Sequence, residues 1–370
     1  MRVAIVGGGP AGLYSAIAIK QRLPSSHIKI YEARNESANE FGLGYTLQTL
    51  TIDLLNRIDP SALDNMFSTK RPPLMQQSSV RVNDRFETRA FEPGYTVSRY
   101  QLIQYLRTKA LGLGVKVIHK KIEIKDVSRL KRMNNLLISA DGVKSLVRMR
   151  YKDAFSAKFH PTKMMFSWFL NESPFDQHQP RFWAVSSDYG VIQMFSYPLL
   201  DCRQIVIVEM TKDCYQKAGF GDKTTEEVTA FLNKCLNVSA DPISLAQGPL
   251  PWVSFGINTV EKLYRGNVAL VGESAFSFHY SYGGGLSTAF MMGYILAECL
   301  SALPLNEALI KYNAGASLSL ADPVRKSREL ILWLEGIDEH FKCTPTKELV
   351  DHYLLRQNYR TSSKVLSGDS

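Results

Sequence analysis

The hydrophobic and polar positions of this chain follow different patterns along its length. In residues 1–154, short β-branched runs and helical patterns predict strands that alternate with helices. Residues 155–260 carry aromatic and β-branched residues in alternation, which predicts a mostly antiparallel sheet. Another strand and long helical patterns follow. We therefore expect a mixed α/β chain with a sheet-rich insertion.

Individual elements follow from this spacing. Strands are expected at residues 2–6, 28–31, 79–82, 115–118, 136–139, 165–170, 191–195, 204–208 and 267–271. Helices are expected at residues 13–23, 47–58, 98–111, 225–236 and 307–342, with another opening at residues 283–286. We expect Ser98 and Asn306 to cap helices, Pro323 to break the last helix and Pro345 to stop it.

The first strand is followed at once by a glycine-rich run, Gly7-Gly8-Gly9-Pro10-Ala11-Gly12. Gly7 allows a tight turn, Gly9 lets the backbone approach a pyrophosphate, and Gly12 lets helix and strand pack closely. Unpaired N–H groups at the helix N-terminus then face the phosphates. Glu32 ends the second strand, where an acceptor for ribose hydroxyls belongs. This arrangement predicts an adenine dinucleotide, without deciding between FAD and NAD, rather than an ordinary glycine-rich turn.

Three later segments carry candidate chemistry. Arg99 lies in the first turn of an expected helix. It is either a clamp on a phosphate or an ordinary surface arginine. Asp141 and Gly142 follow a strand. The acid there can accept a hydrogen bond from a cofactor hydroxyl, or the two residues form an ordinary turn. A second glycine-rich helix start, at residues 283–286, can place backbone N–H groups against developing negative charge.

Composition narrows the class of protein. With 370 residues, 45% of them hydrophobic and 21% charged, the chain can bury a large core. The net charge of +9 is spread along the sequence, which suits anionic cofactors better than nucleic acid. The five cysteines show no ligand spacing, so we expect reduced thiols, no metal site and a cytoplasmic protein. We expect neither a signal peptide nor a membrane span.

The motifs together resemble the class A flavoprotein monooxygenases, the para-hydroxybenzoate hydroxylase superfamily. The matching stretches are the glycine run at 7–12, SRYQL at 98–102, ADGVKSLVR at 140–148 and VGESAFSFHYSYGGGLSTA at 271–289. Phe41-Gly42-Leu43-Gly44 and the HYSYGGG stretch at 279–285 resemble a subgroup that includes the tryptophan hydroxylase of violacein synthesis and the salicylyl-CoA hydroxylases. Residues 208–215 also resemble the violacein enzyme.

The resemblance implies a bound FAD and NADPH or NADH as a transient co-substrate. The implied cofactor-binding residues are Gly7, Gly9, Pro10, Ala11, Gly12, Glu32, Arg34, Gly44, Arg99, Asp141, Gly142, Gly272, Glu273, Gly283, Gly285, Leu286 and Ser287. Glu273 stands where an aspartate is usual, and Tyr280 and Tyr282 stand where many relatives have Pro and Gly.

The resemblance also implies a domain organisation. We expect a Rossmann-like FAD-binding domain of the GR2 type at 1–72, 93–154 and 262–322, substrate-domain strands at 73–92, a mostly antiparallel substrate domain at 155–261, C-terminal helices at 323–358 and a flexible tail at 359–370.

The implied reaction is hydroxylation of an aromatic substrate with O2 through a flavin C4a-hydroperoxide. An indole or tryptophan-derived or phenolic compound of secondary metabolism is the first substrate expectation. His279 is a candidate general base or a structural histidine, and Tyr280 is a weaker catalytic candidate. Tyr45 and Tyr282 are expected to line the substrate pocket.

Other readings of the same fold stay open. One alternative function is an aryl-CoA hydroxylase of aromatic catabolism. A second is a flavin oxidase or reductase. A flavin-containing scaffold or redox sensor is a third. A halogenase is disfavoured because the chain has no run with paired tryptophans like that of the flavin halogenases. The sequence does not predict the oligomeric state.

Overall fold

The computed structural model describes most of the chain. The described residues are 1–34, 44–67, 71–72, 74–171, 179–198, 204–236, 245–247 and 251–358. Phe41, Gly42 and Leu43 of the subgroup motif, and the tail expected at 359–370, lie outside them.

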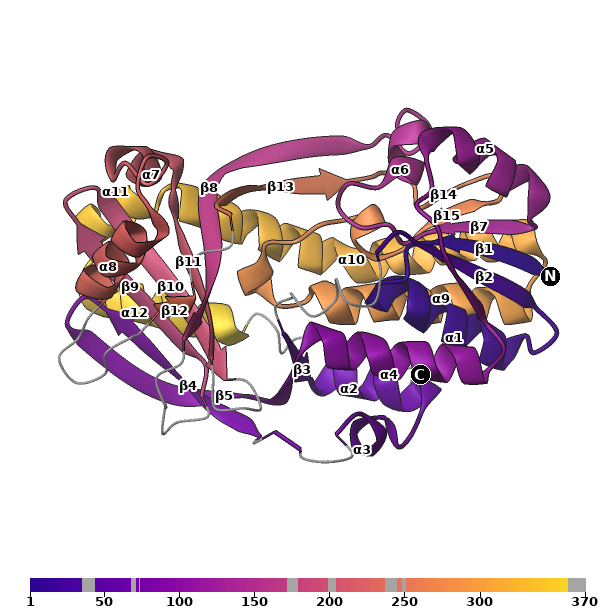
Figure 1. Ribbon diagram of the computed structural model, residues 1–370, viewed down its shortest axis with the longest axis horizontal. Coiled ribbons are helices and arrows are strands. Elements are labelled where there is room, and N and C mark those ends of the chain that lie inside the picture. The colour runs from indigo at the N-terminus through magenta and orange to yellow at the C-terminus, as the bar shows by residue number, and fades with distance from the viewer. Residues whose placement is uncertain are drawn as a thin grey trace.

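One six-stranded sheet contains the strands expected at residues 2–6, 28–31, 115–118, 136–139 and 267–271 (Figure 1). Its order is β14 (Tyr264–Arg265), β15 (Val268–Leu270), β7 (Leu136–Ser139), β1 (Arg2–Val6), β2 (His27–Glu32) and β6 (Lys116–His119). All neighbours pair in parallel except β14 with β15. β7 is buried throughout, as expected for a parallel strand covered on both faces.

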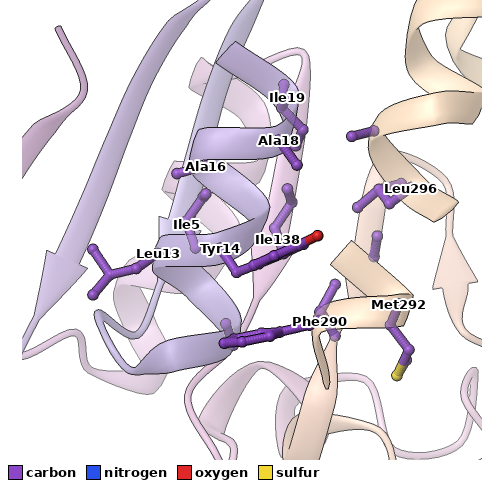
Figure 2. Close-up of a cluster of buried hydrophobic side chains, with 14 of the residues drawn as sticks. Ile5, Leu13, Tyr14, Ala16, Ala18, Ile19, Ile138, Phe290, Met292 and Leu296 are labelled. Atoms are coloured by element: carbon purple, nitrogen blue, oxygen red, sulfur yellow. The ribbon is translucent and has the colours of Figure 1, made fainter. Parts of the chain in front are cut away.

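Helices that pack on one another cover this sheet. They include α1 (Pro10–Arg22), α4 (Arg99–Gly112), α5 (Ile124–Met133), α6 (Leu146–Arg150) and α9 (Gly285–Ala302). α1 contacts both α4 and α9, and Tyr14 stacks on Phe290 with ring centroids 4.3 Å apart (Figure 2). Among the described residues α9 is the one helix long and apolar enough to cross a membrane, and 61% of it is buried inside the protein.

A second, nine-stranded sheet lies at the other end of the molecule (Figure 1). Its strands are β3 (Tyr45–Gln48), β4 (Met75–Val82), β5 (Arg85–Val97), β8 (Lys158–Asn171), β9 (Arg181–Ser187), β10 (Gly190–Pro198), β11 (Gln204–Thr211), β12 (Leu245–Gln247) and β13 (Val253–Thr259). They pair antiparallel apart from β4 with β9. The strands expected at 73–92 and those of the segment expected at 155–261 therefore belong to one sheet.

Seven further helices lie among the described residues. They are α2 (Thr49–Ile58), α3 (Ala62–Met66), α7 (Lys212–Lys217), α8 (Thr225–Leu236), α10 (Leu305–Glu335), α11 (Ile337–Cys343) and α12 (Thr346–Asn358). α7 and α8 cover one face of the second sheet. The long helix α10 packs on α9 near one end of the molecule and on β8 near the other. It therefore ties the two sheets together (Figure 1).

Most predicted elements are confirmed to within a few residues, and three expectations are wrong. The expected helix at 47–58 begins only at Thr49, because the two residues before it pair with β5. α10 begins at Leu305, before Asn306, with Pro304 preceding it. Pro323 does not break α10, since buried side chains on both sides of it hold the helix in place; the helix expected at 307–342 is interrupted at Gly336 instead, between α10 and α11.

The contact between α1 and α9 generates a stability prediction. An added Cβ at Gly293 would lie 2.6 Å from Ser15 Oγ and 3.2 Å from the Tyr14 ring, so Gly293→Ala must push the helices apart. We expect the free energy of unfolding to fall by about 1–3 kcal/mol in urea denaturation. Gly315→Ala in α10 is the matched control, because an added Cβ there would lie 3.6 Å from Ile295 Cγ2, an ordinary van der Waals contact. It should stabilise by up to about 1 kcal/mol, because alanine is the better helix former. Equal effects at both positions would contradict this account.

Candidate cofactor groove and aromatic wall

The glycine run after β1 makes a turn that only glycine can adopt. Gly7 has φ +105°, and an added Cβ there would lie 2.2 Å from the Ala140 carbonyl oxygen. A Cβ at Gly12 would lie 2.0 Å from the Gly7 oxygen. Gly9 is different, because a Cβ there would meet nothing within 4 Å. The loop is therefore tightly packed at its base and open at Gly9, where α1 begins.

Glu32, the expected ribose acceptor, lies across this open loop. Its carboxylate accepts the Gly8 N–H at 2.6 Å and the Arg34 N–H at 2.8 Å. A carboxylate has about four acceptor sites, so Glu32 can accept further hydrogen bonds from a ligand.

Two helix N-termini converge beside this loop. Gly272 has φ +65°, and a Cβ there would lie 2.9 Å from the Ala11 Cβ and 3.2 Å from the Ala289 Cβ. It is thus wedged between the first turns of α1 and α9. Neither helix has a side-chain cap or an acidic residue in its first turn. Their N–H groups and partial positive charges are therefore available to one anionic ligand.

Arg99 and Glu273 face the same groove. The Arg99 guanidinium donates to Tyr45 Oη at 3.3 Å, while its buried Nε has no hydrogen-bond partner among the described residues. Glu273 is solvent-exposed although both neighbours in sequence are buried. The surrounding protein raises the pKa of its carboxyl group by desolvation, and the Arg99 charge opposes that rise. Burial likewise raises the pKa of Tyr45, against the charge of Arg99.

The Asp141 carboxylate is directed away from this groove. Its oxygens accept from Ser139 Oγ at 2.6 Å and from the Leu146 N–H at 2.7 Å, at the start of α6. Gly142, at φ +77°, leaves open space where a side chain would lie. The acid therefore holds the loop in shape by hydrogen bonds within the protein.

Arg148 joins this loop to the turn that carries Glu273. Its buried guanidinium donates to the carbonyl oxygens of Ser274 at 2.8 Å, Glu273 at 3.3 Å and Val143 at 2.5 Å. Arg148 lies in the ADGVKSLVR stretch, but this role was not predicted from the sequence.

An aromatic wall on the second sheet continues the groove. We use this name for Phe166, Phe195, Tyr197 and Ile207, which are buried together, with Trp168, Phe182, Ile205 and Tyr280 packed against them. Tyr197 Oη donates to the Gly44 carbonyl oxygen at 3.2 Å, directly before Tyr45. The wall therefore begins beside the residue that contacts Arg99.

Glu209, which sequence reasoning missed, lies behind this wall. Its carboxylate accepts from His279 Nε2 at 2.6 Å and from Tyr280 Oη at 2.9 Å. The signal was present in the alternation of β11, which places Glu209 on the same face as Ile205 and Ile207.

Both ring nitrogens of His279 are engaged. Nδ1 lies 2.6 Å from Ser281 Oγ and accepts the Ser281 N–H at 3.3 Å, so we assign the ring proton to Nε2, which donates to Glu209. His279 is also 1% exposed. This favours the structural role over the general base. Tyr282, the other pocket candidate of this loop, packs on Phe278 with ring centroids 5.6 Å apart.

The chain was compared with family models, with curated proteins and with solved structures. No family model matches the chain. It is 25% identical to salicyloyl-CoA 5-hydroxylase of Streptomyces sp. over 96% of this chain and 70% of that protein. It is 22% identical to protodeoxyviolaceinate monooxygenase of Chromobacterium violaceum over 92% of this chain and 90% of that protein. The chain's relatives are aromatic monooxygenases of the flavin type. They match the subgroup that the sequence resembles.

Solved structures agree on the fold. Klebsiella pneumoniae HpxO, solved with FAD and uric acid, superposes with a TM-score of 0.68 at 16% identity, covering 97% of this chain and 93% of that one. The fold class is therefore the mixed α/β fold of flavin-dependent oxygenases, as expected.

Arg148 generates a prediction for the groove. Arg148→Lys replaces a guanidinium that joins Val143 to Glu273 and Ser274 by a single ammonium that cannot bridge both sides, so we expect a loss of about 1–3 kcal/mol in the free energy of unfolding. Arg150→Lys, at the exposed end of the same helix, should stay within about 0.5 kcal/mol of the wild type. Chemical denaturation of the three proteins tests this, and an unchanged Arg148→Lys would show that the bridge contributes nothing.

Proposed function

We propose that this protein is an FAD-dependent monooxygenase that hydroxylates an aromatic substrate with NAD(P)H and O2. The observation that carries the proposal is the convergence of two uncapped helix N-termini on Gly272. Such a pair of N-termini suits a ligand that is anionic at one end and gains negative charge at the other, and a flavin dinucleotide has both properties.

The groove fits an FAD by its own chemistry. Gly9 has open space in place of a Cβ, and the buried Nε of Arg99 has no hydrogen-bond partner in the described part of the chain. Gly9 and the first turn of α1 would hold the pyrophosphate, and Glu32 the adenosine ribose. Arg99 and Glu273 would contact the chain that links the pyrophosphate to the flavin ring.

The flavin, when bound, would supply hydride acceptance and oxygen activation. The first turn of α9, at Gly285, Leu286 and Ser287, would donate backbone N–H groups to the pyrimidine edge of the flavin as it gains charge. The aromatic wall would exclude water from the reacting ring. NAD(P)H would bind transiently, because the described residues form a single nucleotide-binding sheet.

An indole, tryptophan-derived or phenolic ring is the first substrate class we propose. The wall offers aromatic faces on which such a ring can stack. An aryl-CoA thioester is the alternative. The name of the Streptomyces relative and the net charge of +9 favour it.

Stopped-flow absorbance of the purified holoprotein tests the proposal. NADPH or NADH is mixed with it in the presence of indoles, phenols and aryl-CoA thioesters in turn. We expect one class to accelerate flavin reduction, and the hydroxylated product to appear after O2 is added. Fast reduction that no aromatic compound changes, without product, would favour an oxidase or reductase. Protein purified without flavin would contradict the FAD site itself.

A glycine substitution tests the cofactor groove separately from turnover. Gly9→Ala places a methyl group where the pyrophosphate would lie, and the φ of −74° at this residue accepts alanine. We expect FAD affinity to fall at least tenfold, or about 1.4 kcal/mol, while the apoprotein stays folded. Gly112→Ala, also in open space but on α4, should bind FAD like the wild type. Flavin fluorescence titration measures both, and equal affinities would place the pyrophosphate elsewhere.

A further inference from the structure

Three cationic side chains surround Tyr151, the residue that follows α6. The Arg265 guanidinium carbon lies 5.1 Å from the centre of the Tyr151 ring, the Arg150 guanidinium carbon 5.5 Å and the Lys131 ammonium nitrogen 5.7 Å. All three lie within cation–π range of the ring. We call these four residues the Tyr151 cluster. Arg150 and Arg265 are exposed and the other two are half-buried, so the cluster is open to solvent.

Three elements that lie together in the fold position the cluster (Figure 1). Lys131 lies in the last turn of α5, Tyr151 follows α6, and Arg265 ends β14. Asn267 Nδ2 donates to the Lys131 carbonyl oxygen at 3.0 Å, which ties the end of α5 to the turn between β14 and β15. An added Cβ at Gly266, in that turn, would lie 3.8 Å from Lys131 Nζ. The backbone therefore brings the cations together from three segments.

None of the three cations forms an ion pair with a carboxylate within the described ranges. Carboxylates close to them in sequence pair with other cations, namely Glu123 with Lys125, Asp126 with Arg129 and Glu261 with Lys158. Asp153, two residues after Tyr151, pairs with none of the three. The cluster therefore concentrates positive charge that the described part of the protein does not neutralise, although like charges repel.

The helix dipoles account for only part of this arrangement. Helix C-termini stabilise cations in their last turn, where Lys131 and Arg150 lie. The end of α5 is already satisfied in part by a side chain, since Asn134 Nδ2 donates to the Leu130 carbonyl oxygen at 2.8 Å. Arg265 belongs to a strand and lies at no helix end. A helix dipole therefore gives no reason for three cations on one ring.

The donors of the cluster indicate the chemistry of its ligand. Two guanidinium groups, one ammonium group and one phenol hydroxyl can donate hydrogen bonds there. A phosphate group presents three oxygens in different directions, so it can accept from donors that come from three segments. A carboxylate presents two coplanar oxygens, which a single guanidinium fork can already satisfy. A phosphate group therefore fits this donor set better than a carboxylate does.

We propose that the Tyr151 cluster binds the phosphate or pyrophosphate group of a ligand, at a site separate from the cofactor groove. Arg265 directly precedes the turn into β15, whereas the far end of β15 leads to Gly272 in the groove. The two sites therefore lie at opposite edges of the six-stranded sheet. Soluble nucleotides and phospholipid headgroups both present this phosphate chemistry. The proposal goes beyond hydroxylation and does not depend on it.

Isothermal titration calorimetry of the FAD-saturated protein tests this site, because bound FAD keeps the probe out of the cofactor groove. Inorganic pyrophosphate is the probe, at low ionic strength, where surface charges are least screened. We expect saturable binding that Arg265→Gln and Arg150→Gln each weaken at least about tenfold, since each variant loses a charge-assisted hydrogen bond. Arg265→Lys keeps the charge but loses the fork, so its affinity should fall between those of the wild type and Arg265→Gln.

Arg132→Gln is the matched control, because Arg132 is exposed in the same last turn of α5 but lies outside the cluster. It removes the same charge, and we expect it to bind pyrophosphate almost as the wild type does. Citrate, a tricarboxylate, separates phosphate recognition from a general attraction of anions, and it should bind more weakly than pyrophosphate. Absence of pyrophosphate binding, an equal loss in Arg132→Gln, or citrate binding as tight as that of pyrophosphate would each overturn the proposal.

Two further probes distinguish the sources of the phosphate. Binding of ADP that Arg265→Gln weakens would identify a soluble phosphate ligand. Cosedimentation with phosphatidylcholine vesicles that contain phosphatidic acid, but not with phosphatidylcholine alone, would identify a lipid headgroup. If neither probe binds through the cluster, the proposal is wrong. None of these measurements needs turnover, so they report on the cluster whether or not the proposed monooxygenase activity is found.

Discussion

The close approach of α1 and α9 is the constraint on which the rest of the structure depends. Two glycines permit it, with Gly293 against Ser15 and Gly272 between Ala11 and Ala289. Because both helices begin beside Gly272, bringing their axes together also brings their N-termini together. The same packing therefore builds the hydrophobic core and concentrates backbone N–H groups on one groove. A wider separation would keep the sheet but lose the shared positive end.

The loop between Gly272 and α9 connects this groove to the second sheet. Arg148 holds its beginning through the Glu273 and Ser274 carbonyl oxygens. Farther along, His279 bonds to Glu209 on β11 and its backbone to Ser327 on α10. Each end of the loop is thus tied to a different part of the protein. Movement of the second sheet relative to the groove would strain these contacts, so cofactor groove and aromatic wall are positioned by one segment.

Local sequence signals were enough for the parts of the site that depend on local structure. The strand, turn and helix around Gly7 to Gly12 follow from backbone sterics within a few residues, and so does Ser98, whose side chain accepts the Gln101 N–H at 3.1 Å. The helix break predicted at Pro323 is wrong, because the helix-breaking preference of proline is outweighed by the tertiary packing of α10. Glu209 could not be assigned a partner from sequence, since His279 is seventy residues away and only the folded sheet brings them together. The roles given to the cofactor residues remain predictions.

The Glu209–His279 pair raises a question of energetics. Removing a carboxylate from water costs several kcal/mol, and a buried ion pair or its hydrogen-bonded equivalent often stabilises a protein no more than apolar side chains of similar volume. Stability therefore gives no reason for a carboxylate here. The Glu209 carboxylate accepts from His279 Nε2 and from Tyr280 Oη, and so joins β11 to the loop before α9. The desolvation cost is then explained by position, because these two hydrogen bonds fix the loop that leads into α9 against the second sheet.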